Sequence, residues 1–95
     1  MSDQESGYLL KILSGNHQGA EVLFHDETAI VGSDLNSDVV LSDSLIEPQH
    51  IYLQFSNDGI TLQPLNGKVF LDGKLVKEES ITVETFQFIT IGSLI

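Results

Sequence analysis

The sequence predicts an all-β domain, an antiparallel sandwich of about 10–11 short strands. Short apolar runs alternate with turn signals about every 8–12 residues, which is the spacing of strands in small all-β proteins. No window of a dozen residues keeps apolar residues at the helical positions i, i+3, i+4 and i+7 without an interrupting Gly or Pro. A chain of 95 residues has room for one such domain and not for two.

The first half of the chain contains four short apolar runs that are expected to be strands. They cover residues 8–13, 21–24, 28–31 and 38–41. The segment 15–19 begins and ends with Gly and is expected to be the hairpin loop between the first two strands. Residues 1–6 are polar and acidic, so we expect a disordered leader followed by a domain over residues 7–95.

The clearest strand pattern lies in the middle of the chain. Three alternate residues are apolar and are expected to point into the core: Ile51, Leu53 and Phe55. Because side chains of a strand alternate between its two faces, Tyr52 and Gln54 are expected on the other face. A turn at 57–59 then leads into a second alternating run at 60–63.

Two dipeptides in the second half predict tight hairpins. Asn66-Gly67 and Asp72-Gly73 both suit a type I′ turn, in which the two central residues need positive φ. They bracket a very short strand at 69–71. Runs at 81–83 and 86–91 complete the predicted set of strands.

The charge of the chain is strongly one-sided. It has 14 acidic residues against four lysines, no arginine and a formal net charge of −10. Nucleic acid is excluded as a partner, because binding phosphates needs clustered Lys and Arg, and an anionic membrane surface is disfavoured for the same reason. An acidic surface favours solubility or a basic partner.

Other compositional features bound the class of protein further. Cys is absent, so the fold has no disulfide and no Cys-based metal site, which is compatible with a reducing cytoplasm. No apolar stretch approaches the roughly 18 residues of a membrane span. The N-terminus lacks the basic and then apolar regions of a signal peptide. We therefore expect a soluble and unprocessed chain.

Four carboxylates lie close together in the sequence without a basic residue among them: Asp34, Asp38, Asp43 and Glu47. Paired carboxylates can perform acid–base chemistry when their environments separate their pKa values. Oxygen-rich loops can also bind Ca²⁺, but this spacing matches no EF-hand. We expect a solvated acidic rim on loops rather than a catalytic or cation site.

The three histidines do not have the spacing of a metal site, and no Cys is present to join them. His17 lies in a predicted turn and is expected to be solvated, while His25 ends a strand. His50 follows Pro48-Gln49 directly and is expected to pin a loop through backbone hydrogen bonds. No nucleophile elbow, P-loop or dinucleotide-binding fingerprint is present. The sequence therefore predicts no enzyme, no catalytic residue, no metal and no cofactor.

A more specific arrangement extends over residues 30–34, 37–43 and 46–50 and continues to Asn66-Gly67. It resembles the forkhead-associated (FHA) domain, a β-sandwich whose apical loops bind phosphothreonine, and the resemblance covers residues 8–95. The family pattern is Gly-Arg, then Ser-x-x-His, then Asn-Gly before a short strand. Three residues match it, and the resemblance implies that they are structural: Gly32, His50 and Gly67.

The departures from the FHA pattern concern the phosphate contacts. Ser33 stands where the family has Arg, Glu47 stands where it has Ser, and Pro48 replaces the usual basic neighbour. The resemblance places the carboxylate of Glu47 where the phosphate would lie, and like charges desolvated together are unfavourable. The sequence therefore predicts an FHA-like fold that does not bind phosphothreonine.

A narrower resemblance rests on Gly32-Ser33-Asp34, on residues 37–43 and on the Ile-x-Pro-x-His motif at 46–50. These residues are similar to the cytoplasmic domain of the inner-membrane ring protein of bacterial type III secretion systems, the injectisome subunit of the YscD type. The resemblance implies a domain in the bacterial cytoplasm at the inner membrane, with neighbouring copies in a ring. It also implies that contact with the membrane is made only by a segment beyond Ile95.

The first functional hypothesis is a non-enzymatic scaffold that docks a cytoplasmic sorting-platform protein independently of phosphothreonine. The candidate contacts lie on the loops 33–37, 42–49 and 65–68, and the residues are Ser33, Asp34, Asp43, Leu45, Ile46, Glu47 and Asn66. Of Leu45 and Ile46, one is expected to plug the end of the sandwich and the other to be exposed.

Two alternatives remain at this point. The chain could be a phosphothreonine-peptide-binding FHA signalling domain, although Lys68 would be the only nearby cation. It could also be an enzyme or a Ca²⁺ module built on the acidic loops, but no nucleophile, base partner or ligand spacing favours that reading.

Overall fold

The computed structural model describes residues 8–13, 15–56, 59–84 and 87–91. These residues form ten strands and no helix, which confirms the predicted all-β class. None of the described residues forms a helix long and apolar enough to cross a membrane. The strands are β1 (Tyr8–Lys11), β2 (Glu21–Phe24), β3 (Thr28–Gly32), β4 (Val39–Val40), β5 (Ile51–Ser56), β6 (Gly59–Pro64), β7 (Val69–Leu71), β8 (Lys74–Leu75), β9 (Ile81–Val83) and β10 (Ile89–Ile91).

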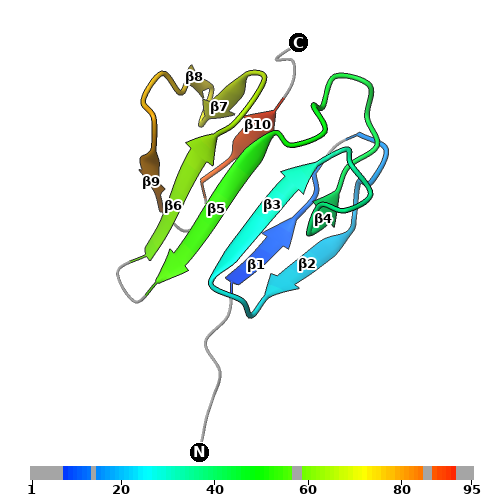
Figure 1. Cartoon of the computed structure of the whole chain (residues 1–95), viewed down its shortest axis with the longest axis horizontal. Helices are drawn as coiled ribbons and strands as arrows, with labels where there is room; N and C mark the ends of the chain where they lie inside the picture. The colour runs from blue at the N-terminus through cyan, green and yellow to red at the C-terminus, as the bar shows by residue number, and fades with distance from the viewer. Residues whose placement is uncertain (1–7, 14, 57–58, 85–86, 92–95) are drawn as a thin grey trace, which may run out of the picture.

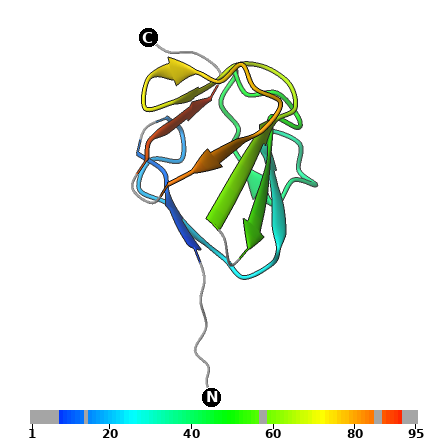
Figure 2. The same cartoon turned by 90° about the vertical axis from the view of Figure 1, so that its left-hand side faces the viewer.

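The strands are arranged as a two-layer sandwich (Figures 1 and 2). One layer is a five-stranded sheet in the order β4-β3-β5-β6-β9. The other layer contains the β1-β2 hairpin and a three-stranded sheet in the order β10-β7-β8. The described pairings are antiparallel except for a short parallel pair between β3 and β4.

The core lies between the two layers and follows the predicted alternation. Ile51 and Leu53 are each 3% exposed, whereas Gln54 on the opposite face is exposed. The Phe55 ring is partly buried and stacks on both Tyr8 and Phe24, with centroid distances of 5.3 and 4.9 Å. The prediction that residues 51, 53 and 55 point inward is therefore confirmed, and Phe55 also ties β5 to the β1-β2 hairpin.

The strand predicted at 38–41 is shorter in the structure and covers Val39–Val40 only. Asp38 does not extend it, because the Oδ2 atom of its side chain accepts the Ile30 N–H at 2.8 Å. The Asp38 N–H donates to the Ile30 carbonyl at 2.9 Å. Asp38 thus bonds both backbone groups of Ile30, and the pairing of β3 with β4 begins only at Val31 and Val39.

The hairpin predicted at Asp72-Gly73 is confirmed. Both residues have positive φ, 50° and 85°, and they join β7 to β8, a two-residue strand that the sequence did not predict. The Asp72 carboxylate accepts hydrogen bonds from the Phe88 N–H at 2.9 Å and the Gln87 amide at 3.0 Å. Both hydrogen bonds lower the pKa of Asp72, and the bond from Phe88 has the larger effect.

The hairpin predicted at Asn66-Gly67 is wrong. Gly67 has a φ of 77°, but Asn66 does not have positive φ, and the strands on either side belong to different sheets. The N–H groups of Leu65 and Asn66 both donate to the His50 carbonyl, at 2.8 and 3.3 Å. The Asn66 side-chain amide donates to the Gln49 carbonyl at 2.9 Å. These bonds hold the segment against the start of β5, so the chain crosses to the other layer instead of turning back.

The ends of the predicted elements shift by a few residues. The loop 15–19 joins β1 to β2 as predicted, but β1 ends at Lys11 rather than at residue 13. The last strand begins at Ile89 rather than at residue 86, and Phe86 lies outside the described residues. The leader expected at 1–6 lies outside them as well.

Candidate functional site: the apical loops

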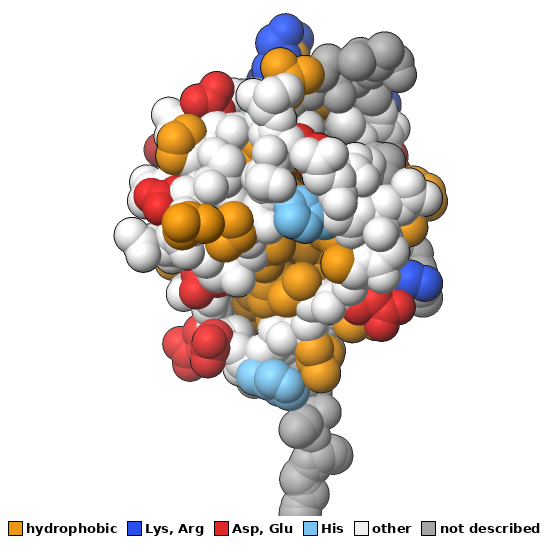
Figure 3. All heavy atoms as spheres, turned by 90° about the vertical axis from the view of Figure 1, so that its right-hand side faces the viewer, with side chains coloured by type: hydrophobic (Ala, Val, Ile, Leu, Met, Phe, Trp, Pro, Cys, Tyr) orange, Lys and Arg blue, Asp and Glu red, His pale blue; other side chains and the backbone are white. Residues whose placement is uncertain are grey.

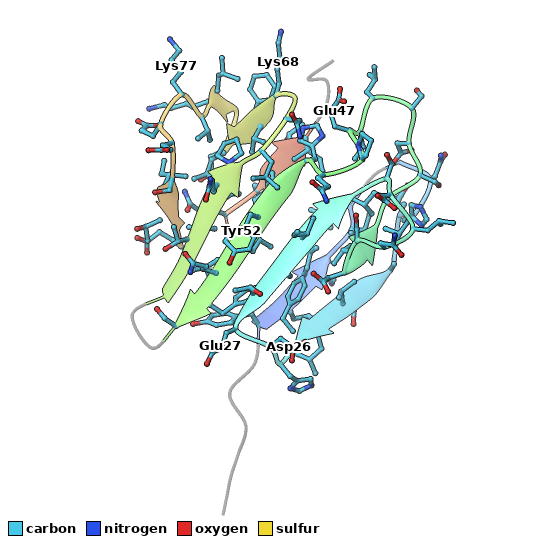
Figure 4. The ribbon with its side chains drawn as sticks, in the orientation of Figure 1. Asp26, Glu27, Glu47, Tyr52, Lys68 and Lys77 are labelled. Atoms are coloured by element: carbon cyan, nitrogen blue, oxygen red, sulfur yellow. The ribbon has the colours of Figure 1, made fainter. Side chains whose placement is uncertain are left out.

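Three connections gather at one end of the sandwich, and we call residues 33–37, 42–49 and 65–68 the apical loops. They follow β3, precede β5 and follow β6. Figure 4 shows Glu47 and Lys68 projecting from this end, whereas Asp26 and Glu27 lie at the opposite end. Most of the candidate residues predicted from the sequence are therefore brought together in space.

His50 joins two of the apical loops from inside. Its side chain is 0% exposed. The Nδ1 atom accepts the Glu47 N–H at 3.0 Å, and Nε2 lies 2.9 Å from the Lys68 carbonyl. Because Nδ1 is an acceptor, the proton is on Nε2, which donates to Lys68, and the ring is neutral. Both ring nitrogens are used in these bonds, so His50 has none left for a metal or a substrate.

Gly67 packs directly on this histidine. A Cβ at position 67 would lie 2.6 Å from Cε1 and 2.7 Å from Nε2 of His50, and 3.0 Å from the Cγ of Glu47. The φ of Gly67 is +77°, a region that side chains with a Cβ rarely adopt. Glycine is therefore required at this position both by backbone conformation and by space.

The loop after β3 is fused to the loop before β5. The Ser33 N–H donates to the Glu47 carbonyl at 3.0 Å, and the Asp34 N–H donates to the Pro48 carbonyl at 3.2 Å. A Cβ on Gly32 would lie 2.1 Å from the Pro48 oxygen, so only glycine permits this approach. The two backbone N–H groups that follow Gly32 are thus engaged with carbonyls of the chain and are not available to an anion.

The acidic residues of the apical loops differ in their environment. The Asp34 Oδ1 atom accepts the Asn36 N–H, and the Asp43 Oδ1 atom accepts the Asn16 N–H, each at 3.0 Å. Both side chains are half-buried, whereas Glu47 is exposed. Among the described residues, no group of three or more His, Asp or Glu side chains is placed to hold a metal ion.

His17, which was expected to be solvated, is half-buried and also hydrogen-bonded to another loop. Its Nε2 atom accepts the Ser42 N–H at 3.1 Å and lies 2.9 Å from the Ser42 hydroxyl, which donates to the same nitrogen. Together with the bond from Asn16 to Asp43, this contact fastens the β1-β2 loop to the loop before β5. The two partners are 25 positions apart, so no local sequence pattern could have indicated the contact.

The apolar residues of the loops divide into a buried and an exposed set. Ile46 packs against the core, while Leu45 is 56% exposed, so the expected division between these two residues is found. Leu35 is 86% exposed and was not predicted, although one large apolar residue between Asp34 and Asn36 was a usable signal. Figure 3 looks onto the side of the molecule on which β2 and β4 lie. It shows apolar side chains both protruding and in a hollow, with acidic groups around them.

A known family model matches most of the chain. The family model described as the cytoplasmic domain of the inner-membrane component of the type III secretion system matches residues 11–95. No curated protein sequence matches the chain.

Solved structures show the same fold. The FHA domain of the CT664 protein from Chlamydia trachomatis has a TM-score of 0.80 at 35% identity, over 92% of this chain and 90% of that chain. The cytoplasmic domain of the sorting platform protein PscD from P. aeruginosa has a TM-score of 0.78 at 28% identity, over 88% and 72%. EmbR from Mycobacterium tuberculosis, solved with a low-affinity phosphopeptide, has a TM-score of 0.74 at 19% identity, over 90% and 22%, and shares the fold alone.

Proposed function

We propose that this chain, which belongs to the family of cytoplasmic domains of the type III secretion system inner-membrane component, is a non-enzymatic scaffold that docks a cytoplasmic sorting-platform protein. The contact would be made by the apical loops and would not depend on phosphothreonine. P. aeruginosa PscD, a structural relative, is itself described as a sorting platform protein. This description supports a role of the present chain in contacts with the sorting platform.

The observation that carries the docking proposal is the combination of fixed loops with exposed apolar side chains. The buried His50 and the bonds of Ser33 and Asp34 hold the apical loops in one arrangement. A surface that is already ordered loses less conformational entropy when a partner binds. Leu35 and Leu45 project from this fixed surface, and binding energy concentrates in a few such anchors.

Three observations support independence from phosphothreonine. Ser33 offers no cation, and the exposed carboxylate of Glu47 would repel a phosphate. The backbone N–H groups of Ser33 and Asp34 are already bonded within the chain. Within the apical loops, all of whose residues are described, Lys68 is the one basic side chain, and it projects away from the end of the sandwich (Figure 4).

Calorimetry can test this proposal against the phosphothreonine-binding alternative. The same sample would be titrated with the sorting-platform protein of its own secretion system and with a library of phosphothreonine peptides. We expect saturable binding of the platform protein, unchanged after the protein has been treated with phosphatase. Micromolar binding of a phosphothreonine peptide, lost with its unphosphorylated form, would favour the signalling function instead.

A further inference from the structure

The β1-β2 hairpin has an outer face that contains none of the apical-loop residues. Leu10 and Ile12 on one strand and Val22 and Phe24 on the other pack against the core. Side chains of a strand alternate between faces, so their neighbours point away from the core. We define the outer hairpin face by these neighbours, which are Leu9, Lys11, Leu13, Glu21 and Leu23.

This face is unusually apolar for an exposed one. Leu9, Leu13 and Leu23 are 56%, 57% and 55% exposed. Leu9 and Leu23 are register partners, so their side chains are direct neighbours across the hairpin. Exposed leucines that occur singly need no explanation, but adjacent ones on one face, as Leu9 and Leu23 are, indicate a contact surface.

The polar part of the face is electrically balanced. Lys11 and Glu21 are also register partners, and their Nζ and Oε2 atoms are 3.9 Å apart. The outer hairpin face is therefore neutral, on a chain whose formal net charge is −10. Lys11 offsets the charge of Glu21, so a second acidic chain meets no local excess of negative charge on this face.

The pattern is self-complementary under a two-fold rotation. An axis parallel to the strands and between them places β1 of each copy over β2 of the other. Lys11 of each copy then faces Glu21 of the other, and Leu9 faces Leu23. A face that pairs with itself in this way is what an isologous dimer needs. We propose that the outer hairpin face is an interface between two copies of this chain.

This proposal goes beyond the docking function and responds to salt in its own way. Two copies with a net charge of −10 repel each other, and salt screens that repulsion. Self-association through leucines should therefore strengthen at high salt, whereas docking of a basic partner on the acidic apical loops should weaken. Failure of one proposal leaves the other standing, because the two use different faces.

Sedimentation equilibrium of the 95-residue chain, from micromolar to millimolar concentration at low and high salt, tests the interface. We expect a monomer–dimer equilibrium that shifts toward dimer at high salt. Lys11→Glu and Glu21→Lys should each weaken the dimer by about tenfold, because each sets like charges against one another across the axis. Lys77→Glu, which changes the net charge as Lys11→Glu does but lies on another face (Figure 4), should weaken it less.

Mixing the two charge variants is the sharpest form of the test. In a mixed dimer each acidic side chain again faces a basic one at both contacts, so Lys11→Glu with Glu21→Lys should associate more tightly than either variant alone. Circular dichroism would confirm that both variants fold. The proposal would be overturned by a chain that stays monomeric at millimolar concentration in high salt. It would also be overturned if the mixed variants associate no more tightly than either variant alone.

Discussion

The imidazole of His50 occupies the space into which a side chain at Gly67 would project, so the ring can hold its place only while position 67 is glycine. A Cβ at Gly67 would lie 2.6 Å from the ring. Through this contact and its two hydrogen bonds, His50 fixes the relative position of two apical loops. The shape of the candidate docking surface therefore depends on a buried residue, His50, which is not itself part of that surface.

Gly67→Ala should destabilise the domain by more than about 1 kcal/mol, because alanine disfavours the positive φ and also meets the His50 ring. Gly73→Ala is the matched control. Its φ is +85°, but nothing lies within 4 Å of its Cβ position, so it carries the backbone cost alone. Urea unfolding of both variants measures the difference. Equal losses would show that the contact with His50 contributes nothing.

His50→Leu should lower the free energy of unfolding by about 2–6 kcal/mol. The variant removes both hydrogen bonds and leaves the Glu47 N–H and the Lys68 carbonyl without their partner, and each such group costs about 1–3 kcal/mol. His25→Leu, at an exposed position after β2, should change it by less than about 0.5 kcal/mol. Denaturant titration of the two variants checks this, and a small effect at His50 would refute its structural role.

Asp72 should make the stability of the fold depend on acid. Its pKa is lowered in the folded chain by the bonds from Phe88 and Gln87. A lowered pKa means that the stabilisation is present above the unfolded pKa of about 3.9 and is lost as the pH falls through the folded value. The stability difference between the wild type and Asp72→Asn should therefore shrink below about pH 4. A difference that stays constant from neutral to acidic pH would contradict this account.

The features that could be predicted from the sequence are local ones. The alternation at 51–55 depends only on neighbouring residues, and the Asp72-Gly73 turn needs only its own two φ angles. The Asn66-Gly67 dipeptide carries a similar turn signal, but bonds to His50 and Gln49, far away in the sequence, determine its path.

The candidate site shows the same limit. That one of Leu45 and Ile46 is exposed and the other buried follows from adjacent positions in one loop, but which one is buried does not. The fusion of Ser33 to Glu47 and the contact of His17 with Ser42 are made between separate loops, so only the folded chain reveals them. For the same reason, the sequence did not show that the backbone N–H groups after Gly32 are occupied.

Glu47→Gln should change the salt dependence of docking more than its strength. Charges at the rim of an interface mainly steer the encounter, so the variant should reduce the effect of salt on the association rate of a basic partner. Stopped-flow or surface-based kinetics with the sorting-platform protein at two salt concentrations measures this. A strong change in the dissociation rate, with the salt dependence of the association rate unchanged, would show that Glu47 is not a rim residue.

The affinity of the sorting-platform protein for Leu45→Ala and for Leu23→Ala tests the central claim most directly. The two leucines are matched in exposure, at 56% and 55%, but only Leu45 lies on the apical loops. Truncation of an interface anchor typically costs about 2 kcal/mol or more, so calorimetry should show Leu45→Ala weakening docking by more than about tenfold. Leu23→Ala should dock like the wild type. Equal affinity of Leu45→Ala and the wild type, or a loss confined to Leu23→Ala, would contradict docking through the apical loops.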